Sequence, residues 1–316
     1  MTWAAVFPGQ GSQSVGMLAD LAADFPVVAE TFAEASAVLG YDLWRLTQDG
    51  PAEALGRTDC TQPAMLAAGV AVWRAWRGQG GGEPAVMAGH SLGEYTALVC
   101  AGAMDFAAAV DLVAARGRFM QEAVPPGTGA MAAVLGLADA AVAEVCAAAA
   151  GDQVVAPVNF NAPGQVVIAG HAEAVARAAA AAKAAGAKRV MDLPVSVPSH
   201  CALMEPAAER LAARLAAVAV RAPSIPVVHN ADLARHQGAE DLRAALVRQL
   251  HSPVRWSETI VGMRTEGLSA VVELGPGKVL AGLCKRIDRD LAAWPVQDGE
   301  SLAAALAGVS GSDDHA

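Results

Sequence analysis

The sequence predicts an α/β fold in two parts, a large domain built on a parallel sheet and a small inserted domain. Short apolar runs that end at glycine or proline alternate with longer segments of helical period, as in parallel sheets covered by helices. One of these runs leads directly into Gly-His-Ser-Leu-Gly. Between residues 125 and 197 the pattern changes to strand, helix, strand, strand, helix, strand. The 316 residues, 54% of them hydrophobic, are enough for two unequal cores.

The first predicted strand, residues 3–7, ends at a glycine-rich turn that contains Gln10. Ligands of open α/β sheets bind at the carboxyl ends of the strands, so Gln10 and the loop amides are candidates to approach a reacting group. An ordinary β-turn is the alternative. The turn lacks the spacing of a dinucleotide fingerprint or a P-loop. Helical periodicity then predicts helices at residues 25–39 and 62–76, with Pro63 in the first turn of the second.

A strand, a sharp turn and a helix are predicted around Ser91. Residues 85–88 are an apolar run, Gly89 and Gly93 flank the turn, and a buried helix begins at Glu94. Gly-x-Ser-x-Gly in this setting is the nucleophile elbow of α/β-hydrolase-like domains, and it predicts Ser91 as a catalytic nucleophile. The Leu92 N–H would then face an oxyanion. A chance match in a glycine-rich chain is the alternative, which the flanking strand and helix disfavour.

A helix predicted at residues 107–122 carries Arg116 and Arg118. Residues two positions apart face different sides of a helix, so one of the two is expected to point inward. A guanidinium near the nucleophile would bind a carboxylate with two hydrogen bonds, and the substrate would then be an acyl group with a free carboxyl. The alternative is a surface arginine whose stem lies along the protein.

The segment of residues 125–197 has the element order βαββαβ, which is the ferredoxin-like pattern. We therefore expect a large domain of residues 1–124 and 198–316 and a small subdomain of residues 125–197. The predicted elements of the small one are strands at 130–135, 154–160, 165–169 and 189–193 and helices at 138–150 and 172–185. After the small subdomain we expect helices at 203–218, 239–250 and around Ile260, strands at 226–228 and 270–274, and a polar tail from Gly308.

A catalytic serine needs a base, and His200 is the favoured histidine. It follows Pro198-Ser199, where the chain returns from the small part to the large one and where a cleft would form. His229 and His251 remain alternatives. The group that would orient the imidazole is open: Asp192 is the nearest carboxylate in sequence, and a backbone carbonyl could serve instead.

Charge and cysteine content exclude several classes of function. The net charge of −10 disfavours general binding to nucleic acids or anionic membranes. The cysteines have no metal-binding spacing and are expected to be reduced and mostly buried, so no metal is predicted; they are Cys60, Cys100, Cys146, Cys201 and Cys284. The N-terminus has no basic segment before an apolar run, and no apolar stretch approaches membrane length, so a cytoplasmic location is expected.

Together these segments resemble the malonyl-CoA:acyl carrier protein transacylases of fatty acid and polyketide synthesis. The resemblance runs in order across nearly the whole chain. The segments that carry it are residues 7–13 (FPGQGSQ), 89–95 (GHSLGEY), 116–121 (RGRFMQ), 159–165 (NFNAPGQ), 198–200 (PSH), 249–250 (QL) with 253–254 (PV), and 273–278 (ELGPGK).

The resemblance implies a role for each matching residue. Ser91 would be acylated, His200 would be its base, and Arg116 would bind the malonyl carboxylate. The backbone carbonyl of Gln249 would orient His200. The remaining implied substrate-binding residues are Gln10 and Leu92, whose amides would form the oxyanion hole, and Asn159, Asn161 and Ser199. Leu92 and Ser199 are similar to the malonyl-preferring members.

The implied reaction is a ping-pong transfer of malonyl from malonyl-CoA to the phosphopantetheine thiol of an acyl carrier protein, without a cofactor, by a monomer. The alternatives are a serine esterase or lipase of α/β-hydrolase type and a non-catalytic carrier-docking module. Carrier proteins resembling this family's partners are acidic, as this chain is, so docking needs a local basic surface. Its candidates are Lys278, Lys285 and Arg286.

Overall fold

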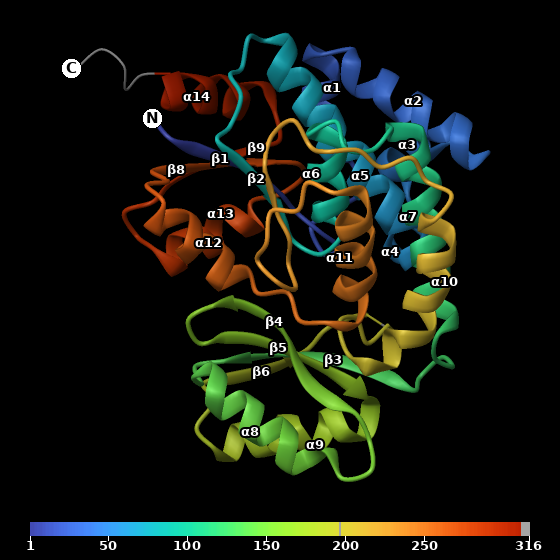
Figure 1. The fold of residues 1–316 in the computed structure, drawn as a ribbon, viewed down its shortest axis with the longest axis vertical. Coiled ribbons are helices and arrows are strands. Elements are labelled where there is room, and N and C mark those ends of the chain that lie inside the picture. Colours follow the sequence, from blue (N-terminus) through green and yellow to red (C-terminus); the bar gives the residue numbers. More distant parts are fainter. Residues whose placement is uncertain (196, 311–316) are drawn as a thin grey trace.

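A computed structural model describes residues 1–195 and 197–310 of the chain (Figure 1). Its larger sheet has five strands in the order β7-β2-β1-β8-β9, and every neighbouring pair is parallel. Their bounds are β1 Trp3–Phe7, β2 Val86–Gly89, β7 Val227–Val228, β8 Ala270–Leu274 and β9 Ala292–Val296. Because the strands are parallel, the loops that follow β1, β2, β7 and β8 all leave from the same edge of the sheet.

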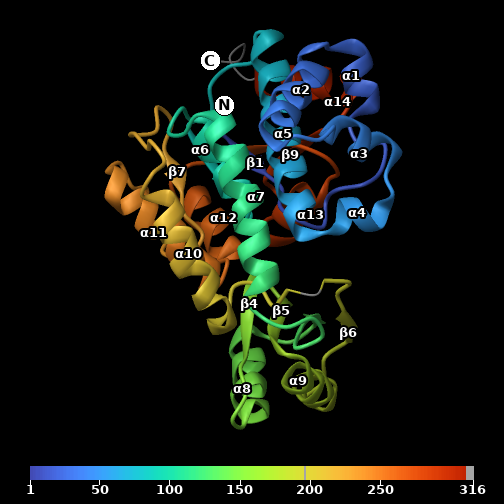
Figure 2. The same cartoon turned by 90° about the vertical axis from the view of Figure 1, so that its right-hand side faces the viewer.

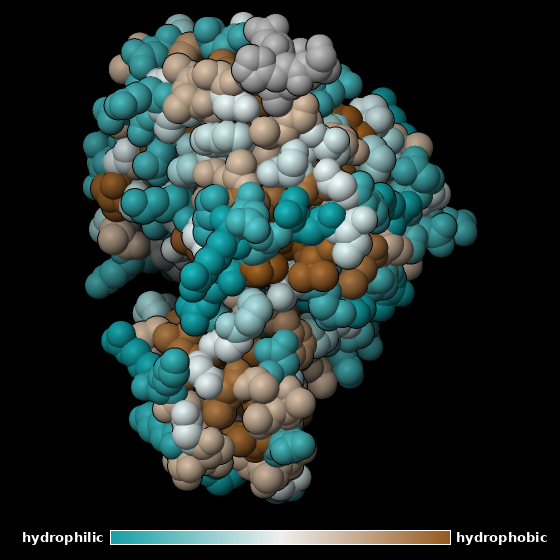
Figure 3. All heavy atoms as spheres, turned by 90° about the vertical axis from the view of Figure 1, so that its left-hand side faces the viewer, coloured by the Kyte–Doolittle hydropathy of each residue, from teal (hydrophilic) through white to brown (hydrophobic). Residues whose placement is uncertain are grey.

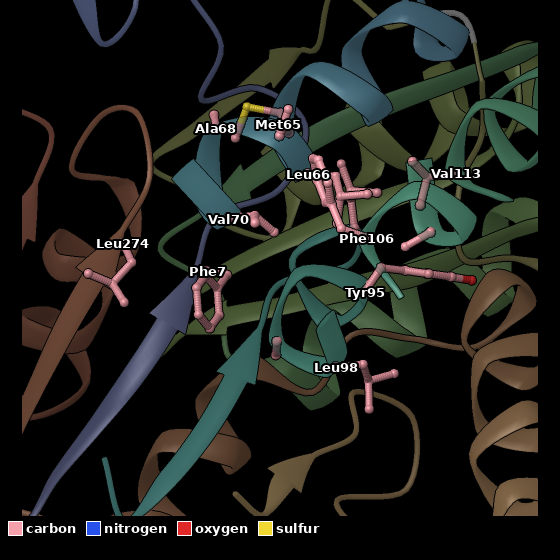
Figure 4. Packing of buried hydrophobic residues seen from close by; sticks show 14 of the residues in the cluster. Phe7, Met65, Leu66, Ala68, Val70, Tyr95, Leu98, Phe106, Val113 and Leu274 are labelled. Carbon is pink, nitrogen blue, oxygen red and sulfur yellow. The ribbon is translucent and has the colours of Figure 1, made fainter. Parts of the chain in front are cut away.

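Helices cover both faces of this sheet, and alternate residues of β1 divide between two cores. Trp3, Ala5 and Phe7 belong to the larger core, together with residues of α5 and α7, and Ala4 and Val6 belong to the smaller core. Figure 4 shows part of the larger core, where Phe7 and Leu274 of the sheet lie near side chains of α5, α6 and α7. Such strands are buried on both faces, and therefore appear in the sequence as continuous apolar runs.

The helices around the sheet account for most of the remaining large part. On the larger core pack α2 Val27–Leu39, α5 Thr58–Gly78, α6 Gly93–Cys100, α7 Phe106–Glu122, α10 Glu205–Leu215 and α11 Ala239–His251. The smaller core is covered by α12 Trp256–Thr265 and α13 Val279–Ile287. The other elements are α1 Ala19–Asp24, α3 Leu43–Asp49, α4 Ala52–Gly56, the 3₁₀ turn Ala202–Met204 and α14 Gly299–Ser310. In the described part of the chain, none of the helices combines the length and apolar character required to cross a bilayer.

A separate four-stranded antiparallel sheet forms the lower part of the molecule in Figures 1 and 2. Its strands are β3 Gly129–Leu135, β4 Val155–Ala162, β5 Gln165–His171 and β6 Arg189–Asp192, in the order β4-β5-β3-β6. The helices α8 Asp139–Ala150 and α9 Ala172–Ala184 pack on it. The molecular surface is notched between this part and the larger one (Figure 3).

The edge strand β4 joins the two parts through backbone hydrogen bonds. The Phe160 N–H donates to the Val254 carbonyl at 2.9 Å, and the Val254 N–H donates to the Val158 carbonyl at 2.8 Å. The register of β4 against β5 shifts at two places, between Pro157 and Asn159 and between Phe160 and Ala162. Such bulges re-aim side chains. Here the two shifts lie on either side of Asn159, and the second falls at Asn161.

The order of the predicted elements is confirmed, but the helices α1, α3, α4, α13 and α14 were not predicted, and the structure differs at three further points. Pro63 does not lie in a first turn, because α5 already begins at Thr58. The strand β9 was not predicted. It contains Pro295, which an edge strand tolerates because one side of its backbone has no strand partner. Residues 308–310 belong to α14 rather than to a polar tail, and the rest of that predicted tail lies outside the described residues.

Candidate active site

The Ser91 turn has a strained backbone conformation and is closely packed against neighbouring backbone. Ser91 lies two residues after the end of β2 and has a φ of 51°, in the left-handed region. A Cβ at Gly89 would lie 1.8 Å from the carbonyl carbon of Gly93, and a Cβ at Gly93 would lie 2.0 Å from the carbonyl oxygen of Phe7. Both positions therefore require glycine. A left-handed serine costs about 1–3 kcal/mol, and such strain is typical of functional turns.

Ser91 and His200, which are 109 positions apart, are in hydrogen-bond contact. Ser91 Oγ lies 2.7 Å from His200 Nε2, and His200 Nδ1 lies 2.8 Å from the backbone carbonyl oxygen of Gln249. A carbonyl only accepts, so Nδ1 carries the imidazole proton and Nε2 is left to accept from the Ser91 hydroxyl. The orienting group left open by the sequence is thus a backbone carbonyl and not the carboxylate of Asp192.

The surroundings of His200 favour its neutral form. The side chain is 3% exposed, and burial is the main reason that its pKa falls to about 3. The positive charge of Arg116 and, to a smaller extent, His90 lower this pKa further, while the Gln249 carbonyl opposes them. A neutral imidazole can accept a proton from Ser91 at neutral pH.

Arg116 is the inward-facing arginine of α7, and Arg118 is exposed. The Arg116 side chain is 1% exposed and its contacts are with neutral groups: Nη2 donates to Gln249 Oε1 at 3.1 Å, and the guanidinium lies 5.3 Å from the centre of the Tyr95 ring. Its Nε has no hydrogen-bond partner within the described residues. A buried charge without a counter-ion is costly, so this guanidinium is prepared to bind an anion.

Gln249 connects the three groups. Its backbone carbonyl accepts from His200, its side-chain Oε1 accepts from Arg116, and its Nε2 donates to the Ser91 carbonyl at 2.9 Å. The residue is completely buried at the end of α11. One residue of one helix, through its backbone carbonyl and its side chain, therefore fixes the spacing between the serine turn, the imidazole and the guanidinium.

A cavity of about 100 Å³ opens beside these groups, between the two sheets. Side chains of the small part, including Met131 and Leu193, form one wall. Its lining residues are Gln10, Gln62, His90, Ser91, Leu92, Arg116, Met120, Met131, Asn159, Leu193, Val195, Val197, Ser199 and His200. Of the residues expected at the site, Asn161 contacts it indirectly, through a 2.8 Å hydrogen bond between its Oδ1 and His90 Nε2. The larger surface hollows lie elsewhere and contain none of the catalytic candidates.

Two backbone N–H groups near Ser91 have no acceptor in the described part of the chain, those of Gln10 and Leu92. The loop after β1 approaches the serine turn so closely that a Cβ at Gly9 would lie 2.4 Å from the His90 carbonyl oxygen. The two amides thus come from neighbouring strand ends, next to the Ser91 hydroxyl. Paired free amides of this kind can stabilise an oxyanion.

Sequence reasoning missed several polar residues of the site. His90, which lies inside the serine turn, was not among the predicted site residues but lines the cavity. Gln62 also lines it, is 1% exposed, and has no partner for its Oε1 within the described residues. Asn230 accepts from the Ser91 N–H at 2.7 Å. A buried polar residue next to an apolar helix or strand was the available signal, but it does not identify the partner. His229 and His251 do not line the cavity.

No group of three or more His, Cys, Asp or Glu side chains in residues 1–195 and 197–310 is arranged to hold a metal ion. The five cysteines are free thiols; Cys146, Cys201 and Cys284 are buried and the other two are partly buried, as expected. Burial raises the pKa of the Cys146 and Cys201 thiols to about 11. These thiols therefore stay protonated and are poor nucleophiles.

Known proteins are similar to this chain over nearly its whole length. The family model described as the acyl transferase domain matches residues 4–306. The malonyl CoA-acyl carrier protein transacylase of Escherichia coli strain K12 is 62% identical over 96% of this chain and 98% of its own. That of Bacillus subtilis is 42% identical over 98% of each.

Solved structures agree. The acyl carrier protein S-malonyltransferase of Vibrio cholerae has a TM-score of 0.94 at 59% identity, covering 96% of this chain and all of that one. A malonyl-transacylase solved in complex with a type II polyketide acyl-carrier protein (PlMCAT:AntF) has a TM-score of 0.96 at 58% identity, covering 98% of this chain and all of that one. The chain is therefore a member of the acyl transferase domain family and belongs, within it, to the malonyl CoA-acyl carrier protein transacylases.

Proposed function

We propose that this acyltransferase moves a malonyl group from malonyl-CoA to the phosphopantetheine thiol of an acyl carrier protein, and so supplies extender units for fatty acid or polyketide synthesis. The observation that carries the proposal is the series of hydrogen bonds from Ser91 through His200 to the Gln249 carbonyl, next to the buried Arg116. It supplies a nucleophile, a base of fixed tautomer and a carboxylate-binding group within one cavity.

In the first half-reaction His200 Nε2 takes the proton of the Ser91 hydroxyl as Oγ attacks the thioester carbonyl. The Gln10 and Leu92 N–H groups stabilise the resulting oxyanion. When the carbon–sulfur bond breaks, His200 returns the proton to the departing coenzyme A sulfur. In the second half the carrier's thiol gives its proton to His200 and attacks the Ser91 ester. Cleavage of the ester bond then restores the serine hydroxyl.

Arg116 selects the acyl group in this proposal. Its guanidinium is buried, pairs with neutral partners and has an unused Nε–H. The free carboxylate of malonate would supply the missing counter-ion. Gln62, Asn159, His90 and Ser199 would line the remaining space, with Asn161 holding the His90 ring through its hydrogen bond. Asn159 Oδ1 is buried and lacks a protein partner in the described residues, which fits contact with substrate.

The alternative of a simple esterase is not favoured. An esterase of this type would orient its histidine with a carboxylate, whereas His200 Nδ1 faces the Gln249 carbonyl. It would also have no use for a buried, unpaired arginine beside the nucleophile.

For the carrier protein, we propose a docking surface made of exposed cations from both parts of the molecule. Lys285 and Arg286 lie in the last turn of α13, and Arg286 lines a groove of about 720 Å³ together with Lys188 and Arg189. Arg189 begins β6, and the chain after β6 forms one wall of the active-site cavity. A carrier bound there would be close to the cavity wall, and the cations would offset the repulsion between two acidic proteins. Lys278 is exposed at the start of α13.

The finer parts of the structural prediction belong to the same proposal. The element and strand order of the small sheet supports a ferredoxin-like subdomain at residues 125–197, inserted into an α/β-hydrolase-like domain of residues 1–124 and 198–316. A monomer, a cytoplasmic location and a reaction without a cofactor are further predictions.

Mass spectrometry after mixing with malonyl-CoA tests the proposed function. We expect a single malonyl adduct on Ser91, none on Ser91→Ala, and loading slowed at least about 10²-fold in His200→Ala. A malonyl adduct on Ser91→Ala would contradict the proposal. Rapid release of malonate to water in place of transfer to a thiol would favour the esterase.

A further inference from the structure

A buried polar cluster below the serine turn has no part in the reaction steps. Glu94 lies in the first turn of α6, and His229 and Asn230 directly follow β7. The exposed fractions of the three residues are 0%, 1% and 1%. Polar groups are buried at such depth only when they are hydrogen-bonded. The contacts of the cluster therefore indicate what it is for.

Those contacts form a chain that ends at the nucleophile. Glu94 Oε1 accepts from His229 Nδ1 at 2.7 Å, and Glu94 Oε2 accepts from the Asn230 backbone N–H at 2.8 Å. The Asn230 side chain then bonds both sides of the turn. Its Oδ1 accepts from the Ser91 N–H, and its Nδ2 donates to the Gly89 carbonyl, each at 2.7 Å.

The turn needs such support because Ser91 is in the left-handed region, with a φ of 51°. A residue with a side chain keeps this conformation only when its surroundings impose it. The strand pairing of β2 with β1 and β7 ends before Ser91. Beyond the sheet, the Ser91 carbonyl accepts from the Glu94 backbone N–H at 3.1 Å, and the side chains of Asn230 and Gln249 add one hydrogen bond each to the serine backbone.

We infer that Glu94, His229 and Asn230 form a positioning unit that holds the Ser91 turn in its reactive conformation. Asn230 fixes the turn, and Glu94 fixes Asn230 and the loop after β7. None of the three contacts Ser91 Oγ or lines the cavity, so they act through Ser91 rather than on the acyl group. The inference rests on the proposed role of Ser91 as the nucleophile, and adds residues that direct its hydroxyl toward His200.

The test compares two reactions of Ser91 in Asn230→Ala. One is single-turnover loading from malonyl-CoA, followed by mass spectrometry. The other is labelling by an alkyl fluorophosphonate, in which the serine oxygen bonds to phosphorus, fluoride leaves, and the hydroxyl proton goes to the base. The second reaction does not use Arg116. Misplacing a reacting group by about 1 Å costs about 10²-fold, so we expect both rates to fall together by about that factor. The Kd of malonyl-CoA, measured with and without Asn230→Ala in a Ser91→Ala background, should not change.

A pair of His229 variants tests the unit without altering Asn230. His229→Leu removes the donor to Glu94, whereas in His229→Asn the side-chain amide can donate from nearly the place of Nδ1. We expect His229→Leu to slow both reactions about tenfold and His229→Asn to restore most of the rate. His236→Leu is the matched control, because its ring lies 5.1 Å from that of His229 but its hydrogen bond goes to Asp232. It should load at the wild-type rate.

The inference is overturned by wild-type rates in Asn230→Ala, by equal rates in the two His229 variants, or by losses that disappear when rates are expressed per folded molecule. A weaker malonyl-CoA affinity in the double variant would also contradict it, since a positioning role leaves binding intact. If the wild-type protein gains the phosphonyl mass but no malonyl mass, the proposed function fails instead. The fluorophosphonate rates would still test the positioning unit. Should Asn230→Ala not fold, the two His229 variants decide the question.

Discussion

Replacing Arg116 by alanine should sharply lower the preference of this enzyme for malonyl over acetyl donors. The guanidinium is 1% exposed, its Nε–H is unused, and its contacts are with neutral groups. Each hydrogen bond between charged groups contributes about 1.5–3 kcal/mol, so a bidentate pair with malonate contributes at least about 3 kcal/mol. At about 1.4 kcal/mol per factor of ten, Arg116→Ala should slow malonyl loading by about 10²-fold or more.

Acetyl loading should respond in the opposite direction. An acetyl group offers no counter-ion, so the wild-type enzyme must accept it while Arg116 stays buried and unpaired. Removing the guanidinium removes that cost. We therefore expect the acetyl rate in Arg116→Ala to stay equal or to rise, and the ratio of malonyl to acetyl rates to fall by at least about 10²-fold.

The assay is single-turnover loading of each donor, followed by mass spectrometry. Arg116→Ala also removes a partner of Gln249, which touches both Ser91 and His200, but that disturbance affects both donors and cancels in the ratio. Arg118→Ala, an exposed position on the same helix, is the control and should not change the ratio. Arg116→Lys should recover only part of it, because an ammonium lacks the planar fork. Equal losses for malonyl and acetyl would show that Arg116 is structural.

Four further predictions concern the site and the surface. Because burial lowers the pKa of His200 to about 3, single-turnover loading should stay flat from about pH 7 to about pH 5; an acid limb near the ordinary value of about 6.5 would contradict this. Over the same range the unfolded histidine binds a proton that the native one does not, so this residue makes stability fall as the pH drops, which urea unfolding can measure. Gln249→Leu keeps the backbone carbonyl but loses the Ser91 and Arg116 contacts, so loading of both donors should slow about tenfold or more, malonyl more than acetyl; unchanged rates would show that only the backbone matters. Lys285→Glu with Arg286→Glu should raise the KM for carrier protein and flatten the salt dependence of that KM, while the rate of transfer to free pantetheine stays unchanged. Lys183→Glu, at an exposed position of α9, is the control. Equal losses with both acceptors would place these cations on the coenzyme A side or in the fold.

Much of the α/β architecture was predictable because its signals are local. The strand β1 is buried on both faces, so it appears as an apolar run of the observed length. The strand β8 follows the same pattern except at Glu273, whose buried carboxylate accepts from the Leu280 and Ala281 N–H groups. The serine turn was predictable for the same reason. Gly89 must be glycine because its neighbour in space is the backbone of Gly93, and Gly93 must be glycine because it packs against the backbone of Phe7. The Gly-x-Ser-x-Gly pattern shows both requirements directly in the sequence. Secondary structure is least visible where a local rule is broken, as at Pro63 inside α5 and Pro295 in β9.

The composition of the site depended on the tertiary structure. Periodicity could show that either Arg116 or Arg118 faces inward, and packing of α7 on α5 decided which. Periodicity could not identify the group that orients His200, and Gln249 was expected there only from the family resemblance. The structure adds two hydrogen bonds of the Gln249 side chain, to Ser91 at a separation of 158 positions and to Arg116 at a separation of 133. Asn230 and Glu94 had no signal of their own. A hydrophobic pattern records whether a side chain is buried, whereas the partner of a buried polar group is set by the order in which the sheet places β7, β2 and β1 side by side.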